Sequence, residues 1–147
     1  MAKHMVARSI VVDAPAKTIF DLVASPSQHA LFDGSGTVQE AVFGPERLAE
    51  GAEFGMDMKM LGVPYRITNR VVEFEENRLI AWKHSGTHRW RYEFAELAGG
   101  RTVVTETFDY SRGLAAFYIL NGAPARNARG IEQTLERLKH TVESKVA

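Results

Sequence analysis

The sequence predicts an α+β domain in which one antiparallel sheet of seven strands is covered on one side by helices. Apolar and polar residues alternate through most of residues 37–110, which is the period of a strand, and helical spacing returns beyond Gly113. Strands in succession with helices segregated toward the ends of the chain are typical of the α+β class. The 147 residues fit one domain, which we assign to 1–147.

Two short helices are predicted after the first strand, which spans residues 6–13. Asp13 is the candidate N-cap of the first helix, because its carboxylate can accept a hydrogen bond from a free backbone N–H. Pro15 is tolerated in a first turn, where its missing N–H would be unpaired anyway. Pro26 ends this helix, and a second short helix is predicted over about residues 26–32.

Six further strands are predicted in the centre of the chain, joined by short turns. Their ranges are 37–43, 54–60, 65–74, 79–84, 89–94 and 102–110. Strands joined by short turns pair with their neighbours, so they form an antiparallel meander. A sheet of this size curls strongly, and a single helix cannot fill its concave side. The space that remains must either collapse or hold something.

A long helix is predicted at the C-terminal end, because an apolar stripe recurs at helical spacing. The stripe consists of Ile131, Leu135, Leu138 and Val142. The segment before it, residues 113–122, is apolar around most of its circumference and is bounded by Gly113 and Gly122. We predict that this segment is a movable cover of an internal cavity. The alternative is the first half of one continuous, well-packed helix.

Composition excludes several classes of function. Eighteen Lys and Arg balance eighteen Asp and Glu, which argues against nucleic acid as a partner and against a polybasic membrane anchor. The chain has no cysteine, so thiol catalysis, disulfides and cysteine metal sites are excluded. No leader is visible, and the longest apolar run, residues 114–120, is too short to span a bilayer. We therefore expect a cytoplasmic protein with no nucleic acid partner, no membrane insertion, no cofactor and no metal.

Several stretches spread over nearly the whole chain carry a family resemblance. They are residues 10–16, 20–23, 77–82, 89–94, 99–107 and 130–138. In these stretches the chain resembles the SRPBCC (START-like) superfamily, and within it the polyketide cyclase/dehydrase-like branch. The resemblance implies a helix-grip fold, in which a curved seven-stranded antiparallel sheet wraps around the long C-terminal helix. It also implies an elongated cavity for an apolar molecule, although this fold hosts hydrolases, cyclases, carriers and receptors alike.

A wall of methionine and aromatic side chains is expected on the inward face of the sheet. Methionine adapts to irregular shapes, and Trp and Tyr combine a large apolar area with one polar group. The expected ligand-binding residues are Met56, Met58, Tyr65, Trp82, Trp90, Tyr92, Phe108, Phe117, Tyr118 and Asn121, with Phe94 on the same wall. The alternative is a tightly filled core without a ligand.

Three residues are candidates for moving a proton: His84, Glu106 and Tyr110. His84 and His88 flank a hairpin loop, but a metal would need a third ligand, and two solvated histidines are the alternative. Glu106, Phe108 and Tyr110 share one face, and an inward Glu106 is costly unless it is paired. Alternation also means that Asp109 and Tyr110 cannot both point inward.

The function expected from these features is the binding of a polyketide, aromatic or lipid-like small molecule between the sheet and the C-terminal helix. A polyketide cyclase or dehydratase is the enzymatic alternative, in which the cavity folds the chain of its substrate. A third alternative is an interaction module of the stress-response co-regulator type, which an exposed apolar patch would indicate. We expect a monomer or a homodimer.

Overall fold

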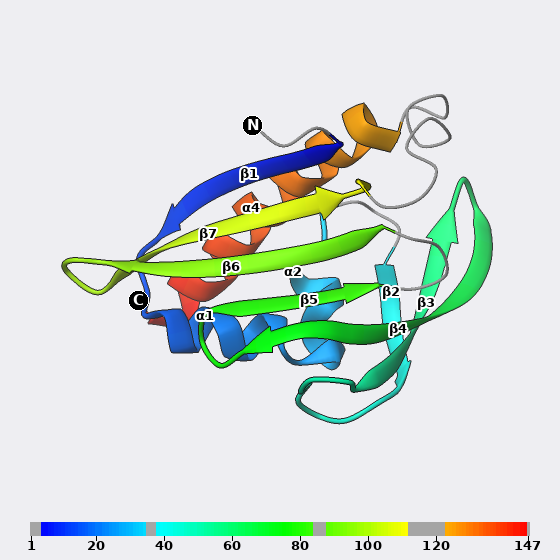
Figure 1. The fold of residues 1–147 in the computed structure, drawn as a ribbon, viewed down its shortest axis with the longest axis horizontal. Coiled ribbons are helices and arrows are strands. Elements are labelled where there is room, and N and C mark those ends of the chain that lie inside the picture. Colours follow the sequence, from blue (N-terminus) through cyan, green and yellow to red (C-terminus); the bar gives the residue numbers. More distant parts are fainter. Residues whose placement is uncertain (1–3, 35–37, 84–87, 112–122, 147) are drawn as a thin grey trace.

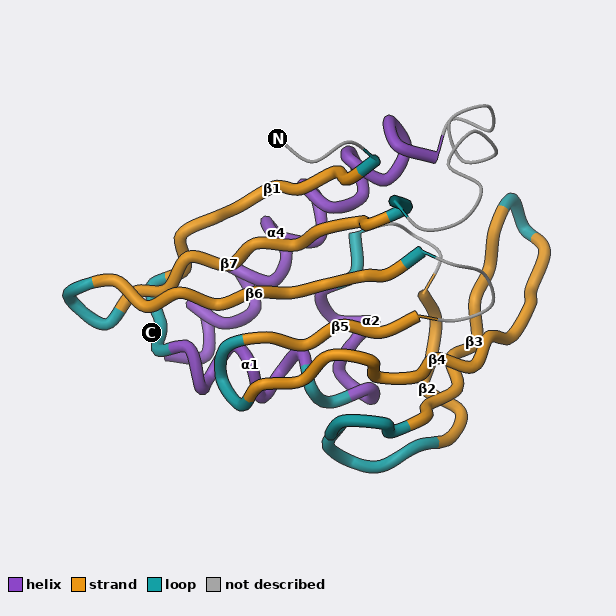
Figure 2. The backbone as a smooth tube through the Cα atoms, viewed as in Figure 1, coloured by secondary structure: helices purple, strands orange, loops and turns teal. Residues whose placement is uncertain are grey.

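The structure is a computed structural model that describes residues 4–34, 38–83, 88–111 and 123–146. A sheet forms one layer, and the helices form a second layer against one face of it (Figure 1, Figure 2). The strands are β1 Met5–Val12, β2 Val38–Phe43, β3 Glu53–Met60, β4 Val63–Glu75, β5 Leu79–Lys83, β6 Arg89–Leu97 and β7 Arg101–Asp109. The helices are α1 Ala16–Val23, the 3-10 turn η1 Pro26–Gln28, α2 His29–Phe32 and α4 Ala123–Val146. The predicted fold class is confirmed.

The sheet has seven antiparallel strands in the order β1-β7-β6-β5-β4-β3-β2. Strands β2 to β7 form the predicted meander, and β1 adds beside the last strand, with Met5 opposite Asp109 and Val12 opposite Thr102. The chain therefore enters at one edge of the sheet, and β2 forms the other edge. At that side the long hairpin of β3 and β4 bends away from the other strands (Figure 1).

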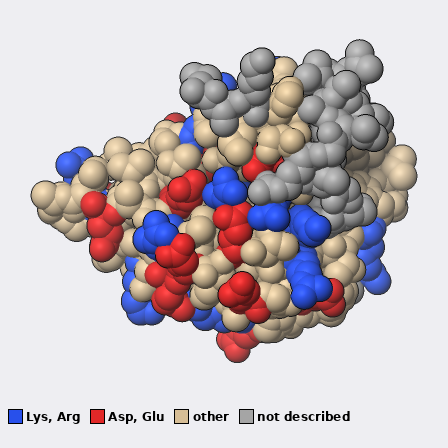
Figure 3. All heavy atoms as spheres, viewed as in Figure 1, with Lys and Arg blue, Asp and Glu red and all other residues tan. Residues whose placement is uncertain are grey.

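The helices cover one face of the sheet, which we call the inner face. The predicted stripe of α4 is buried at all four positions, and α4 packs mainly on β1, with further contacts to α2 and β7. Helix α1 covers β6, where Phe20 is fully buried and meets the ring edges of Phe74 and Phe94. The outer face carries both acidic and basic side chains (Figure 3). The core therefore lies between one sheet and two separate helical segments.

The start of α1 differs from the prediction. Pro15 occupies the N-cap position, and Asp13 makes no side-chain cap. Instead, a side chain from β6, two strands away from β1, serves the helix: the Ala16 N–H donates to Glu96 at 3.3 Å. The backbone N–H of Asp13 donates to Glu143 of α4 at 2.8 Å. A carboxylate from β6 thus takes over the role that we assigned to Asp13.

Candidate functional site

Aromatic side chains line the inner face in rows that cross the sheet. Directly opposed residues of an antiparallel pair place their side chains on the same face. Two such rows are Ile80–Tyr92–Glu106 and Trp82–Trp90–Phe108. Trp82, Tyr92 and Phe108 are buried, and Trp90 is partly buried against the core. The inward orientation that the sequence predicted for these four residues is what the structure has.

A histidine that sequence analysis did not select lies at one end of this wall. His29 is buried, its ring stacks on Trp82 with 5.0 Å between centroids, and its Nε2 lies 2.8 Å from the carbonyl oxygen of Val23. Burial lowers the pKa of His29 to about 4, so the ring is neutral near pH 7. Phe32 and Phe54 meet the same ring edge-on. His29 is therefore part of the aromatic wall.

A second aromatic group lies where β6 begins and β7 ends. The rings of Trp90 and Phe108 lie 4.9 Å apart, and Tyr110 stacks on Phe108 at 5.4 Å. His88 contacts the same Phe108 at 5.4 Å. His84, its predicted neighbour across the loop, lies outside the described residues. Within the part of the chain that the structure describes, no three His, Asp or Glu side chains are grouped to hold a metal ion.

Glu106 lies on the inner face of β7, one row away from Phe108 of the second aromatic group. It is only 4% exposed, and the hydroxyl of Tyr92, directly opposite on β6, hydrogen-bonds its carboxyl group. Among the described residues its Oε1 atom has no hydrogen-bond partner. Burial raises the pKa of Glu106 to about 8, the nearby Asp33 adds to the rise, and the Tyr92 hydrogen bond opposes it. The carboxyl group is thus mostly protonated at pH 7.

The same surroundings change the pKa of the Tyr92 hydroxyl. Burial first, and the neighbouring Glu106 second, raise the pKa of the Tyr92 hydroxyl well above its usual value. Tyr92 therefore stays protonated and serves as a hydrogen-bond donor to Glu106. The pair forms a polar group inside an otherwise apolar wall.

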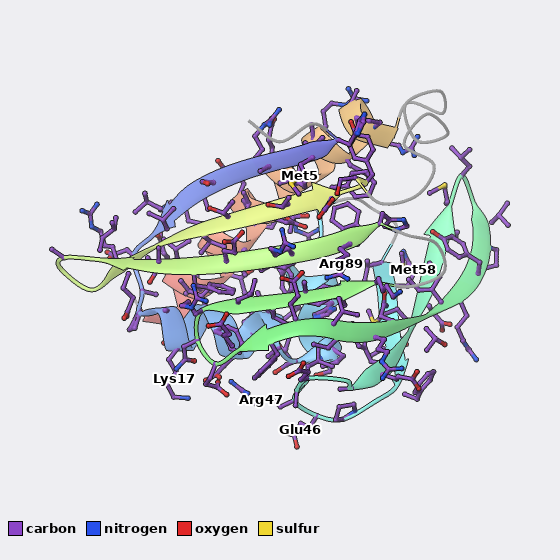
Figure 4. All side chains as sticks on the ribbon, viewed as in Figure 1. Met5, Lys17, Glu46, Arg47, Met58 and Arg89 are labelled. Atoms are coloured by element: carbon purple, nitrogen blue, oxygen red, sulfur yellow. The ribbon has the colours of Figure 1, made fainter. Side chains whose placement is uncertain are left out.

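Asp109 and Tyr110 are both buried, but on opposite faces of the sheet. Asp109 lies on the outer face, where the hydroxyl of Ser111 donates to it at 2.5 Å and Arg91 lies 3.9 Å away. Arg89, at the start of β6 (Figure 4), and Arg91 both pair with Glu73 of β4, at 3.1 and 2.8 Å. The predicted alternation holds, and Asp109 is buried beside an ion-pair cluster rather than in the core.

The remaining predicted ligand residues fall into two groups. Met56 is buried in the core, whereas Met58 is only partly buried (Figure 4). Tyr65, opposite Met58, is 40% exposed because the β3–β4 hairpin bends away from the others at this end. Phe117, Tyr118 and Asn121 lie outside the described residues, as does the predicted cover, 113–122. Their proposed roles stay predictions.

The junction between α2 and α4 closes one side of the inner layer. The Gly34 N–H donates to Thr134 of α4 at 2.8 Å. Arg137 of α4 donates to the carbonyl oxygens of Leu31 and Asp33 at the end of α2. These bonds satisfy carbonyl groups that a helix end leaves free. They also fix the backbone of Asp33, whose side chain acts on Glu106.

Two hollows lined by described residues lie on the surface. One is beside Gly34 and α4, and the other is on the β3–β4 hairpin, beside Met58 and Tyr65. Both are open to solvent. Neither hollow lies in the interior. Among the described residues, we therefore take the buried Glu106–Tyr92 pair, rather than either hollow, as the candidate group for proton transfer.

Solved structures share this architecture from end to end. Protein NE0264 from Nitrosomonas europaea superposes with a TM-score of 0.77 at 12% identity, covering 99% of this chain and 97% of that one. A START superfamily protein from Mycobacterium smegmatis gives 0.72 at 16% identity, over 96% and 98% of the chains. The Polyketide_cyc-like protein Cgl2372 from Corynebacterium glutamicum gives 0.66 at 22%, over 99% and 96%. The fold is therefore that of the START-like, helix-grip class.

Sequence comparison narrows the class to a family. The chain belongs to the family described as polyketide cyclase / dehydrase and lipid transport, which it matches over residues 3–143. Protein Rv0088 from Mycobacterium tuberculosis H37Rv is 46% identical over 138 residues, which are 90% of this chain and 62% of that protein. Protein MT0096 from the CDC 1551 strain is 45% identical with the same coverage. The chain thus spans 62% of the length of these curated relatives.

No helix in the described part of the chain has the length and the apolar character to cross a membrane.

Proposed function

We propose that this protein binds an apolar, ring-containing small molecule between the inner face of the sheet and α4. The observation that carries the proposal is the continuous aromatic wall on adjacent strands, in which Trp82, Trp90, Tyr92 and Phe108 face the helical layer. Flat rings pack on such a wall through offset and edge-on contacts. The family description, which includes polyketide chemistry and lipid transport, supports an aromatic, polyketide or lipid-like ligand.

Titration with a panel of aromatic polyketides, flavonoids and fatty acids tests this proposal. Both tryptophans lie on the wall, so we expect a saturable change in their emission with at least one class of compound. We also expect a higher melting temperature, because a ligand that binds only the folded state must stabilise it. Trp82→Phe and Trp90→Phe identify which ring reports the binding. If no compound changes the emission and the melting temperature stays constant, the proposal is wrong.

An enzyme of the cyclase or dehydratase type is the second candidate, and the Glu106–Tyr92 pair favours it. A carboxyl group that titrates near pH 8 can give and take a proton close to working pH, and the cavity would hold the reacting carbons together. His84 and Tyr110 are the other proposed proton carriers. We expect Glu106→Gln to lower turnover of a short polyketide mimic more than Tyr110→Phe or His84→Ala. Unchanged turnover in all three variants would exclude these roles.

A further inference from the structure

The carboxyl group of Glu106 has one satisfied oxygen and one free oxygen inside the protein. Tyr92 is the hydrogen-bond partner that acts on the group, and Oε1 is buried with no partner among the described residues. Leaving a buried polar atom unpaired costs free energy, so such an atom calls for an explanation. Its neighbours on the inner face are Tyr92, directly opposite on β6, and the Trp90–Phe108 pair one row further along β6 and β7.

The direction of the Tyr92 bond determines where the proton of the carboxyl group lies. A protonated tyrosine hydroxyl donates, so the carboxyl oxygen that it contacts accepts. In the neutral acid the carboxyl proton then belongs on the other oxygen, the one without a partner. This places an O–H donor on the inner face, with no acceptor for it among the described residues.

We infer that Glu106 donates this hydrogen bond to the bound molecule and selects ligands that carry a neutral acceptor oxygen, such as a ketone, ester or quinone carbonyl. The inference rests on the proposed function, because it concerns the polar contact of the same ligand. A hydrocarbon of equal shape would leave the donor unpaired, and the loss of a buried hydrogen bond discriminates more strongly than a change of shape.

The charges around Glu106 explain why the acceptor has to be neutral. Asp33, at the end of α2, is the charged group that acts on Glu106, so a ligand carboxylate here would meet a like charge. Arg8 lies opposite Glu106 on β1, but its guanidinium pairs with Glu132 of α4 at 3.0 Å. Tyr92 on β6 is uncharged. Neither of the residues that lie directly opposite Glu106 on the neighbouring strands therefore offers an unpaired cation to balance a ligand anion.

A matched pair of probes tests the inference: 1-acetylnaphthalene, which has a carbonyl oxygen, and 1-ethylnaphthalene, which has nearly the same shape without it. Calorimetric titration at pH 6.5 should show about 3- to 10-fold tighter binding of the acetyl compound, the range that one buried hydrogen bond provides. With a carbon-13 label in the carbonyl group, its infrared band should move to lower frequency on binding. Above pH 8 the preference should disappear, because the ionised carboxylate can only accept.

Three variants test whether the preference for the acetyl compound comes from the hydrogen-bond donor of Glu106 or from a general change in the fold. Glu106→Leu has no donor, so the preference and the infrared shift should be absent at every pH. Glu106→Gln keeps an N–H donor at every pH, so the preference should persist above pH 8. Thr102→Val is the control, since Thr102 is fully buried on the same strand and bonds the carbonyl of Ala14, away from the wall. It should keep the wild-type preference and its pH dependence.

Each failure has its own meaning. If neither naphthalene binds any of the folded proteins, the proposed function fails for this class of ligand and the inference fails with it. If both bind wild type with equal affinity, or if Glu106→Leu keeps the preference, the proposed function stands and the inference is overturned.

Discussion

Replacing Glu106 with glutamine is expected to abolish the loss of stability that the wild-type protein shows between pH 6.5 and pH 8. The pKa of Glu106 is raised from 4.5 to about 8 in the folded chain, so between these values the folded state binds the extra proton. Stability therefore falls as pH rises through this window, by about 1.4 kcal/mol per pH unit. Above pH 8 the wild-type protein carries the full cost of a buried carboxylate, and the glutamine variant does not.

The titration of His29 changes the stability in the opposite direction and cancels part of the effect of Glu106. Its pKa is lowered from 6.5 to about 4, so between these values the unfolded state binds the extra proton and stability rises with pH. The two slopes cancel between about pH 4.5 and pH 6.5. The wild-type protein should therefore show a plateau there, followed by a decline of about 2 kcal/mol up to pH 8.

Urea denaturation at half-unit pH intervals tests the two assignments together. Glu106→Gln should become more stable up to pH 6.5 and then stay level. His29→Phe, which keeps the ring but cannot titrate, should lose stability from pH 4.5 up to pH 8, whatever constant offset the change introduces. The ion-paired Asp21, Glu73 and Glu143 have lowered pKa values and act only at more acid pH. Parallel curves for the three proteins would contradict both assignments.

Much of the fold follows from short-range patterns. The alternation along residues 102–110 places Glu106 on one face with Phe108 and Tyr110, and the structure keeps that arrangement. Alternation alone cannot say which face is inner, because that depends on where α4 packs. The stripe of α4 was predictable because its large apolar residues Ile131, Leu135, Leu138 and Val142 recur on one helix face. The side of the sheet that it covers is a long-range property.

The site residues that sequence analysis missed depend on contacts between distant segments. His29 is a lone histidine on a four-residue helix, and its burial depends on contacts with distant strands, such as its stacking on Trp82 of β5. Asp13 looked like a helix cap by composition, yet Glu96 from β6 supplies the bond that we assigned to it. Asp109 is buried on a face that alternation assigns to solvent, beside Arg91, which pairs with Glu73 two strands away from β6. None of these pairings leaves a local signal.

Replacing Gly34 with alanine is expected to destabilise the protein by about 1–3 kcal/mol, through overpacking at the junction of α2 and α4. A methyl group on Gly34 would lie 2.5 Å from the backbone carbon of Gln133 and 2.5 Å from the backbone nitrogen of Thr134. These atoms belong to α4 and cannot turn aside as a side chain can. The helix and the loop must separate, which weakens the 2.8 Å bond from Gly34 to Thr134.

Gly55→Ala is the matched control, because its methyl group would also make a contact shorter than 3 Å, but with a side chain. The nearest atoms belong to the ring of Phe43, at 2.2 and 2.5 Å, and that ring is 48% exposed. The ring can rotate into solvent, so the urea concentration at the midpoint of unfolding should decrease less than for Gly34→Ala. Adding Phe43→Ala removes the contact at Gly55, whereas no side-chain truncation on α4 removes the backbone contact at Gly34. Equal costs for the two alanine variants would show that the α2–α4 junction yields as easily as an exposed ring.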